Sequence, residues 1–350
     1  MPGGWTVVGA AIIAGGGSRH VTKPLQSRPM PGPLAVLDRL ADGRFHSGGE
    51  LSEALGVART TVWTYVRELE ALGLDIYAVR GRGYRLAEPI VRLNAAAIRA
   101  HLERAGVPAP PLHVLDDVDS TNAWLKAHAE GSANGTSCLA ERQSAGRGRR
   151  GRRWASPFAR NLYLSVLWRL PARAVPGLSI AVGVAVAEAC EDLGAFGLKL
   201  KWPNDILGAR GKVGGILIEL ASELPATCTA IIGIGLNVDM PARLRAGIDQ
   251  PVSDLNEESG QRVPRNALAA AILARLAAAI PRFELEGLAP FRARFAQRDA
   301  SLDRTVTVEE AGALRSGRAR GIDEHGALLL ETADGIASIQ SGDVSLRAAP

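Results

Sequence analysis

The residues with the clearest potential for chemistry are the three glycines and five arginines of GRGRRGRRW, residues 146–154, here called the arginine loop. So many guanidinium groups cannot share an apolar core, because desolvating them together would cost too much free energy. Glycine leaves the backbone bare, so backbone N–H groups and guanidiniums can close around an anion from several sides. The segment matches neither the phosphate loop GxxxxGK[ST] nor the dinucleotide-binding pattern GxGxxG. Taken alone, it fits a basic linker or a nucleic-acid contact about as well as an anion-binding loop.

Other polar side chains with potential for binding lie where predicted strands and loops meet. They are Ser120, Thr121, Asn122, Gln143, Asn204, Asp205, Lys212 and Asn237. Ser, Thr and Asn at a strand-to-helix junction are also ordinary helix caps, and a lysine beside glycines alone fits a solvated turn. Pro203 ends the preceding predicted strand and leaves two of these residues at its end. Together with the arginine loop, they predict one polar site built on strand ends.

The elements that must position this site alternate between strands and helices. Strands are expected over 112–115, 137–141, 161–170, 198–202, 216–220 and 230–238, and helices over 94–104, 123–129, 179–193 and 266–283. Short strands are expected near the C-terminus over 306–308, 315–322, 327–331 and 336–339. We therefore predict an α+β protein with a disordered extension (1–30), an N-terminal domain (31–88), a central site-bearing domain (89–298) and a small C-terminal β-barrel (299–350).

The N-terminal domain has the pattern of a winged helix-turn-helix. After a short amphipathic helix, the capping box of Ser47 and Glu50 begins a second helix. Its inward residues are expected to be Leu51, Ala54 and Leu55. A third helix is predicted over 59–72, although Ala58 is a poorer N-cap than Ser or Thr by about 1 kcal/mol. Residues 76–86 then predict a β-hairpin with a basic, glycine-containing tip.

The outward face of the third helix and the hairpin tip are polar and basic. The residues expected to contact DNA are Arg59, Thr60, Thr61, Thr64, Arg67, Arg80 and Arg82. In such domains the third helix reads the major groove and the wing touches phosphates. The alternative is a winged-helix fold used only for protein contacts. DNA binding is favoured because no acidic residue precedes Glu68 on this helix.

The bulk composition is compatible with these domains. The chain has 350 residues, 47% of them hydrophobic, which suggests two or three domains with ample core. The formal charge of +5 fits contact with phosphates or nucleic acid. Three cysteines, odd in number and far apart, form no metal pattern or disulfide framework and indicate a reducing cytoplasm. No apolar run reaches the roughly 18 residues that span a bilayer, so no membrane association is expected. A start at Met30 is open, since ordered patterning begins just after it.

Four motifs carry a resemblance to a known family. They are DSTN at 119–122, the arginine loop, KWPND at 201–205 and GKVGGIL at 211–217. With these motifs the sequence is similar to the biotin–protein ligase family, and more closely to bacterial bifunctional biotin ligases and biotin operon repressors. The resemblance extends over residues 33–347. It implies a central domain like that of class II synthetases and a C-terminal barrel like an SH3 domain.

The resemblance also implies a two-step reaction. Biotin and ATP give biotinyl-5′-adenylate and pyrophosphate, and a lysine of a biotin carrier domain, usually of acetyl-CoA carboxylase, then attacks the adenylate. Cations must gather the mutually repelling carboxylate and phosphates, and donors must meet the charge that develops on them. Mg²⁺ is expected to be held mainly by the phosphates.

The same resemblance implies roles for individual residues. Biotin would be bound by Ser120, Thr121, Asn122, Gln143, Arg147, Gly148, Arg149 and Lys212. ATP would be bound by Arg149, Arg152, Trp154, Asn204 and Asn237. Catalytic roles would belong to Arg149, which retains the adenylate, Lys212 at the carboxylate and α-phosphate, and Asp205, which deprotonates the acceptor lysine. The arginine loop is expected to be disordered when empty and to fold over ligand, and no protein metal site is expected.

Several functions remain open at this point. The leading one is a cytoplasmic ligase that also represses transcription, with adenylate promoting a homodimer on a two-fold operator. Alternatives are a ligase whose N-terminal domain no longer binds DNA, a regulator that senses adenylate without useful ligation, and a lipoate ligase. The arginine loop and the DNA-binding pattern speak against the lipoate ligase.

Overall fold

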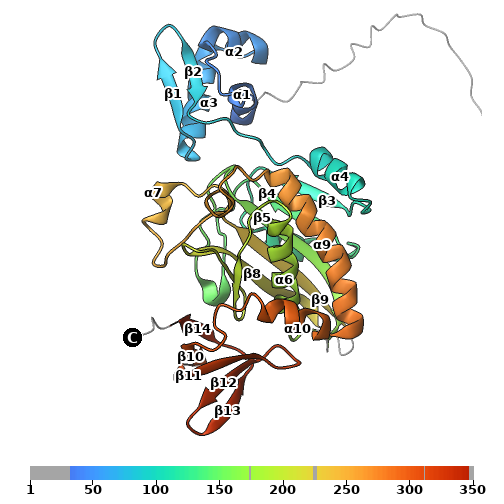
Figure 1. Cartoon of the computed structure of the whole chain (residues 1–350). Helices are drawn as coiled ribbons and strands as arrows, with labels where there is room; N and C mark the ends of the chain where they lie inside the picture. Colours follow the sequence, from blue (N-terminus) through green and yellow to red (C-terminus); the bar gives the residue numbers. More distant parts are fainter. Residues whose placement is uncertain (1–31, 173–174, 224–226, 311, 347–350) are drawn as a thin grey trace, which may run out of the picture.

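The computed structural model describes residues 32–172, 175–223, 227–310 and 312–346. The predicted extension over 1–30 lies outside these residues. Figure 1 shows three parts along one line: a small domain at one end, a central sheet with helices, and a second small domain at the other end. The predicted α+β class with a winged helix-turn-helix at the N-terminus is confirmed.

The N-terminal domain consists of α1 (Pro33–Leu40), α2 (Gly48–Leu55), α3 (Arg59–Ala71) and the antiparallel hairpin β1 (Ile76–Val79) and β2 (Gly83–Leu86). The capping box of Ser47 and Glu50 is present, and Ala58 makes no side-chain cap bond to α3. The buried residues shared by the three helices are Val36, Leu37, Leu40, Leu51, Val62, Val66 and Leu69. The expectation that Ala54 faces inward is wrong: it is exposed, because α2 packs with only Leu51 fully buried.

The central domain is built on a seven-stranded mixed sheet in the order β3-β4-β5-β9-β8-β7-β6. Its strands are β3 (Leu112–Leu115), β4 (Ser137–Ala140), β5 (Leu162–Pro171), β6 (Lys199–Lys201), β7 (Asp205–Leu207), β8 (Lys212–Glu223) and β9 (Thr227–Leu236). Only β3 and β4 pair in parallel, and the other neighbours are antiparallel. Long antiparallel pairs of this kind bring segments that are distant in sequence into residue-by-residue register.

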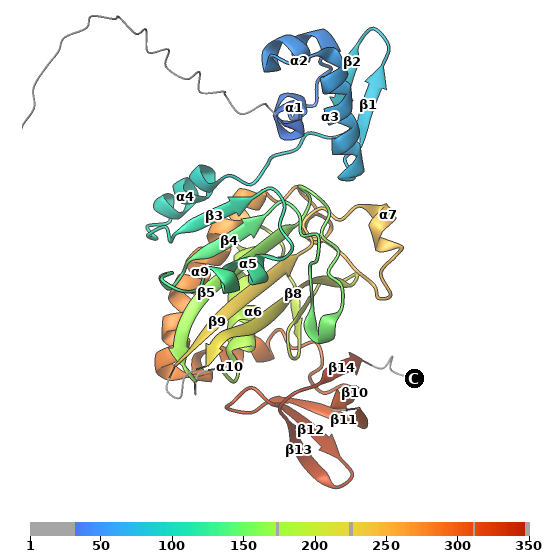
Figure 2. The same cartoon turned by 180° about the vertical axis from the view of Figure 1, so that it is seen from behind.

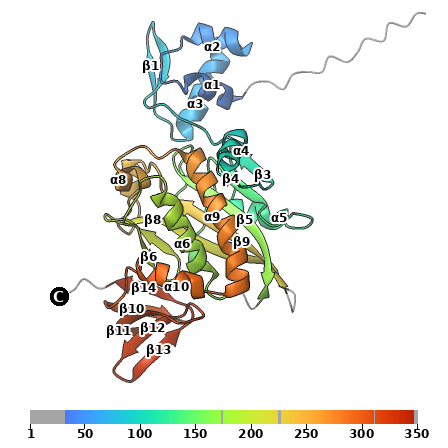
Figure 3. The same cartoon turned by 45° about the vertical axis from the view of Figure 1, so that its right-hand side comes forward.

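Two helices cover one face of this sheet. Figure 3 shows α6 (Leu178–Glu191) and α9 (Arg265–Glu286) side by side across it, with α10 (Ala289–Ala296) at their lower end. α6 is apolar on nearly every side because it lies between the sheet and α9. The remaining helices are α4 (Ala95–Arg104), α5 (Thr121–Ala127), the 3-10 turn η1 (Arg149–Gly151), α7 (Ala242–Arg245) and α8 (Leu255–Ser259). The opposite face of the sheet is therefore left for α5 and the loops.

The C-terminal domain is a five-stranded antiparallel sheet in the order β13-β12-β11-β10-β14. Its strands are β10 (Thr305–Glu310), β11 (Ala313–Ile322), β12 (Leu328–Thr332), β13 (Gly335–Ile339) and β14 (Asp343–Leu346). The four predicted strands are present, and β14 was not predicted. β14 pairs with β10, so it occupies one edge of this sheet.

The segment between the first two domains is held down along its length. Arg160 Nη1 lies 2.8 Å from the Glu88 carboxylate, and Arg265 Nη2 donates to the Val91 carbonyl at 2.8 Å. Glu141 is 1% exposed and accepts hydrogen bonds from the Leu93 N–H at 2.5 Å and from Arg265 at 2.7 Å. A buried carboxylate needs such partners to offset its desolvation. The connection is thus held against the central domain by polar contacts.

Candidate active site

The floor of the candidate site is a bare patch of the central sheet. Gly233 pairs with Ser165 and Leu217, while Gly235 lies two residues further along the same strand, so both glycines face the same side. A Cβ atom on Gly233 would lie 2.9 Å from Asn122 Cγ, and one on Gly235 would lie 2.7 Å from the Trp154 ring. Glycine at both positions therefore lets these side chains lie against the sheet, on the face away from α6. A cavity of about 870 Å³ opens above this floor.

One end of the cavity is polar and lies at the start of α5. Ser120 caps the helix by accepting from the Ala123 N–H at 3.5 Å, as expected from its position at a strand-to-helix junction. The Gln143 side-chain oxygen accepts from the Thr121 N–H at 2.9 Å. Asn122 is 4% exposed and is bonded on both sides of its amide. The helix begins two residues earlier than predicted, which brings these residues into its first turn.

The arginine loop forms one wall of the cavity as a small hairpin. The backbone N–H of Trp154 donates to the Gly146 carbonyl at 2.9 Å, and the backbone N–H of Gly148 donates to the Arg152 carbonyl at 2.7 Å. Its tip is η1, where Arg150 has a φ of 53°. Figure 2 shows the loop, in green beside β8, extending toward β14. The loop thus has a defined conformation here, and its expected folding over ligand stays a prediction.

Asp343 at the start of β14 contacts three arginines of this loop. Its carboxylate lies 2.7 Å from Arg152, 3.4 Å from Arg149 and 3.5 Å from Arg150. Arg149 also donates to the Gly342 carbonyl at 3.0 Å. Burial lowers the pKa of Arg149, and Asp343 acts in the opposite direction. The C-terminal domain therefore supplies an anion to a loop that is otherwise strongly cationic.

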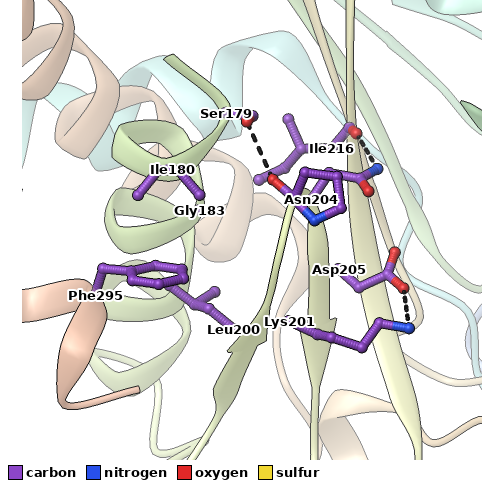
Figure 4. Close-up of a pocket in the computed structure, with 10 residues that line it drawn as sticks. Ser179, Ile180, Gly183, Leu200, Lys201, Asn204, Asp205, Ile216 and Phe295 are labelled. Atoms are coloured by element: carbon purple, nitrogen blue, oxygen red, sulfur yellow. Dashed lines mark hydrogen bonds and ion pairs between the residues drawn. The ribbon is translucent and has the colours of Figure 1, made fainter. Parts of the chain in front are cut away.

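A second cationic group lies across the floor. Lys212 Nζ is 2.6 Å from Asp205, and Lys201 Nζ is 3.1 Å from the same carboxylate. Figure 4 shows Lys201 and Asp205 side by side on their strands, and Asn204, whose amide donates to the Ile216 carbonyl at 2.7 Å. Lys212 was expected to precede a strand; instead it begins β8, so the glycine pair that follows lies within the strand. This placement gives Lys212 a fixed position facing the cavity.

Two further residues complete the site. The buried Trp154 Nε1–H has no hydrogen-bond partner among the described residues, so a ligand could accept from it. Lys212 Nζ lies 5.6 Å from the centroid of the Trp154 ring. Asn237 is 3% exposed and donates to the Ser253 carbonyl at 3.1 Å, which holds the chain after β9 at the cavity.

The structure brings together every residue that the sequence predicted for the ligand site. The cavity is lined by Ser120, Thr121, Asn122, Gln143, Arg147, Gly148, Arg149, Arg152, Trp154, Asn204, Asp205, Lys212 and Asn237. Sequence reasoning missed the rim formed by α7 and the residues after it, among them Arg243, Leu244 and Ile248. It also missed Asp343. A proline before a short basic helix was the only local signal for the rim, and no local signal marks Asp343.

This arrangement of domains and site matches known proteins over most of the chain. Residues 114–237 match the biotin/lipoate A/B protein ligase family, residues 34–85 match an HTH domain, and residues 301–347 match the biotin protein ligase C-terminal domain. The bifunctional ligase/repressor BirA of Escherichia coli is 41% identical over 320 residues, which cover 91% of this chain and 98% of that protein. The chain belongs to the bifunctional biotin ligase/repressor family.

Two other members of the wider ligase group are also similar. The biotin–[acetyl-CoA-carboxylase] ligase of Mycobacterium tuberculosis is 33% identical over 261 residues, covering 72% of this chain and 95% of that protein. The structure of the biotin protein ligase from Aquifex aeolicus in complex with biotin and ATP has a TM-score of 0.59 at 31% identity. It covers 68% of this chain and 99% of the Aquifex chain.

The DNA-binding part expected of a ligase/repressor is also open to contact. The predicted residues Arg59, Thr60, Thr64, Arg67, Arg80 and Arg82 are exposed, and Thr61 is half-buried. Arg67 lies 3.0 Å from the Glu70 carboxylate on the same helix, so this acid partly balances its charge. The sequence analysis did not predict this ion pair. Trp63 is 53% exposed on the same face and was missed. Arg82 lies over the Phe45 ring at 4.0 Å, which holds the tip of the wing against the segment before α2.

Proposed function

We propose that this chain joins biotin to ATP, forming biotinyl-5′-AMP and pyrophosphate, and then transfers biotin to a lysine of the biotin carrier domain of acetyl-CoA carboxylase. The observation that carries the proposal is the layout of the cavity. Uncharged hydrogen-bonding residues line its end at α5, Lys212 lies beside Trp154 on the floor, and arginines line one wall. A molecule with a polar uncharged head, a carboxylate and a polyphosphate partner fits that order.

The polar end is proposed to bind the head of biotin through Ser120, Thr121, Asn122 and Gln143. Lys212 then faces the carboxylate and the α-phosphate, where it offsets their repulsion as the carboxylate oxygen attacks phosphorus and pyrophosphate leaves. Arg147, Gly148, Arg149 and Arg152 close over the phosphates and the adenylate. Arg149 keeps the reactive adenylate from escaping.

The nucleotide is proposed to lie against Trp154, with Asn204 and Asn237 holding its other edges. The bare strand position at Gly235 lets the indole lie flat on the sheet, and its free N–H is available to a ligand acceptor. Mg²⁺ would enter with ATP, held mainly by the phosphates. Among the described residues no cluster of three or more His, Cys, Asp or Glu could hold a metal, and Asp205 is already paired with two lysines.

In the second step, the acceptor lysine nitrogen attacks the acyl carbon and AMP leaves with the bonding electrons. We propose that Asp205 receives the proton of that amine. Lys201 and Lys212 hold its carboxylate at 3.1 and 2.6 Å, which positions it beside the cavity.

The N-terminal domain is proposed to make the same chain a biotin-responsive repressor. α3 and the wing would bind operator DNA, and adenylate would favour a homodimer that places two such domains on a two-fold site. No helix in the described part of the chain has the length and apolar character to cross a membrane. The cytoplasmic location stays a prediction.

The first test is ATP–pyrophosphate exchange with biotin, with lipoate and with neither. Exchange that depends on biotin would support the proposed activation step. Exchange only with lipoate would overturn the substrate, and no exchange from folded protein would leave an adenylate-sensing regulator as the better proposal.

A second candidate function is a ligase without repression. The pairing of Arg67 with Glu70 favours it, because a neutralised arginine contributes less to phosphate binding. A gel-shift with the DNA upstream of the biotin genes, with and without biotin and ATP, separates the two. A shift that requires both ligands supports the repressor.

A further inference from the structure

A chain of hydrogen bonds connects the polar end of the cavity to the base of the arginine loop. The Thr121 backbone N–H donates to the Gln143 side-chain oxygen at 2.9 Å, and Gln143 Nε2 lies 3.4 Å from Ser156 Oγ. Ser156 Oγ lies 3.1 Å from the Trp154 carbonyl oxygen, and the Trp154 backbone N–H donates to the Gly146 carbonyl at 2.9 Å. Thr121, Gln143 and Trp154 line the cavity, whereas Ser156 does not. The proposed sites for the biotin head and the nucleotide are therefore joined through a serine outside the cavity.

Backbone groups at the two ends fix the direction of these bonds. A backbone N–H can only donate, so the Gln143 oxygen must face Thr121 and the Gln143 nitrogen must face Ser156. The Thr121 hydroxyl lies 3.1 Å from the same oxygen and agrees with this direction, because it can donate as well. A carbonyl can only accept, so the Ser156 proton is used by Trp154, and a Ser156 lone pair accepts from Gln143. Alanine at position 156 would remove both links.

The start and the end of the arginine loop meet at this serine. A Cβ atom on Gly146 would lie 2.8 Å from Ser156 Oγ, so the bare glycine lets the loop backbone pass directly against the hydroxyl. The Tyr163 hydroxyl lies beside Ser156 and donates to the Pro157 carbonyl at 3.0 Å, so its proton is not used by Ser156. A shift of the Ser156 hydroxyl would therefore move the base on which the arginines stand.

The link between Gln143 and Ser156 is the loosest of the chain. At 3.4 Å it is longer than the usual range of about 2.7–3.2 Å for an N–H···O hydrogen bond. Gln143 is half-buried and has a long side chain, so fixing it in one rotamer costs conformational entropy. A ligand that orders the Gln143 amide would therefore order the base of the loop with it.

We propose that Ser156 is a positioning residue that couples binding of the biotin head at α5 to binding of the nucleotide against Trp154. The proposal rests on the proposed function and deepens it. Biotin fixes the Gln143 amide, Gln143 fixes the Ser156 hydroxyl, and Ser156 holds the Trp154 carbonyl at the base of the arginine loop. Without this hydroxyl each ligand keeps its own contacts, but neither gains from the presence of the other.

The test measures binding of both ligands to the full chain by calorimetry, with Mg²⁺ present throughout. The nucleotide is an ATP analogue with a methylene group between the α- and β-phosphates, which does not release pyrophosphate. Each ligand is titrated alone and with a saturating amount of the other. In wild type, biotin should lower the Kd of the analogue by about fivefold or more, as is usual for coupled sites. The analogue should lower the Kd of biotin by the same factor, because coupling is reciprocal.

Ser156→Ala should reduce this coupling factor to about twofold or less, because it removes both links of the chain. The Kd of each ligand alone should stay within about threefold of wild type, because Ser156 does not line the cavity. A merely structural role would instead weaken both ligands and leave the factor unchanged. Ser156→Cys is a second variant for the case that Ser156→Ala does not fold. Its thiol is close in size to the hydroxyl but is a weak donor and acceptor, so the factor should fall here too.

Ser144→Ala is the matched control, because it makes the same substitution in the same segment. Ser144 is exposed, follows Gln143 directly, and donates to the Val118 carbonyl at 3.4 Å. It does not line the cavity. This variant should keep the wild-type coupling factor and both dissociation constants.

The outcomes separate this proposal from the proposed function. If wild type binds biotin and the analogue without coupling, the role of Ser156 is wrong. It is also wrong if the folded Ser156 variants keep the wild-type factor. If wild type does not bind biotin at all, the proposed function itself fails.

Discussion

The contact between Asp343 and the arginine loop gives a sharp prediction about the free protein. Replacing Asp343 with Asn keeps the size of the side chain but removes the charge that faces Arg149, Arg150 and Arg152. The loop should then open more often, because Arg149 and Arg152 lose their anion, while Arg150 keeps its ion pair with Glu309 at 3.1 Å. Trypsin, which cleaves after arginine, should therefore cut residues 146–154 faster in Asp343→Asn than in wild type.

The magnitude follows from the exposure of the three pairs. The arginine side chains are 28%, 37% and 68% exposed, for Arg149, Arg150 and Arg152, against 20% for Asp343. Partly exposed pairs contribute roughly 0.2–1 kcal/mol each, and the most exposed one contributes least. A total of about 1–2 kcal/mol corresponds to about a 5- to 30-fold rise in the open population. The cleavage rate should rise by this factor when opening is fast relative to cleavage.

The assay is limited trypsin digestion at low enzyme, followed by mass spectrometry of the fragments. Asp334→Asn, in the turn between β12 and β13, is the control, because no described arginine or lysine pairs with its carboxylate. Thermal unfolding of both variants checks that the C-terminal domain is intact. Equal cleavage rates in wild type and Asp343→Asn would refute the reasoning. Addition of biotin and ATP should slow cleavage in both.

Three further outcomes are expected. Gly235→Ala should raise the KM for ATP at least tenfold and change the KM for biotin little, because the added Cβ would push Trp154 off the sheet. An unchanged KM for ATP would contradict this. Lys212→Met should slow biotin-dependent exchange by about 10²–10³-fold, as for loss of one preorganised charge, and retained exchange would remove Lys212 from the proposed chemistry. Burial raises the pKa of Cys138 and of Cys190 to about 12, so at pH 8 both thiols stay protonated. Both should therefore react with iodoacetamide only after unfolding. Labelling of the native protein would show that these sites open.

The helices and most strands could be predicted from the sequence because each is encoded by neighbouring residues. The capping box of Ser47 and Glu50 and the period of Val62 and Val66 placed α2 and α3 without any tertiary information. The predicted bounds of a strand were wrong where pairing with neighbouring strands extends it. β8 begins at Lys212 because it pairs with β7 and β9, although its local pattern indicates a glycine turn.

The sequence predicted which side chains line the candidate site but not all of the contacts that hold them together. The arginine loop, Lys212 and the DSTN motif are unusual enough locally to mark binding residues. Asp343 and Glu219 are not, since single carboxylates on strands are common in proteins. The fold alone decides what each contacts, and it places three arginines opposite Asp343 and the Asn122 amide opposite Glu219.

The sequence by itself determined the domain order, the charge of the loop and the residue types available for binding. Tertiary structure decided which face of the sheet carries the candidate site and which carboxylates meet which donors. The physical reason is the range of the interactions. Helix periods, caps and turns act within a few residues, whereas strand register aligns Ser165, Gly233 and Leu217, which are spread over about seventy residues of chain. Only that alignment leaves the bare floor on which the site is built.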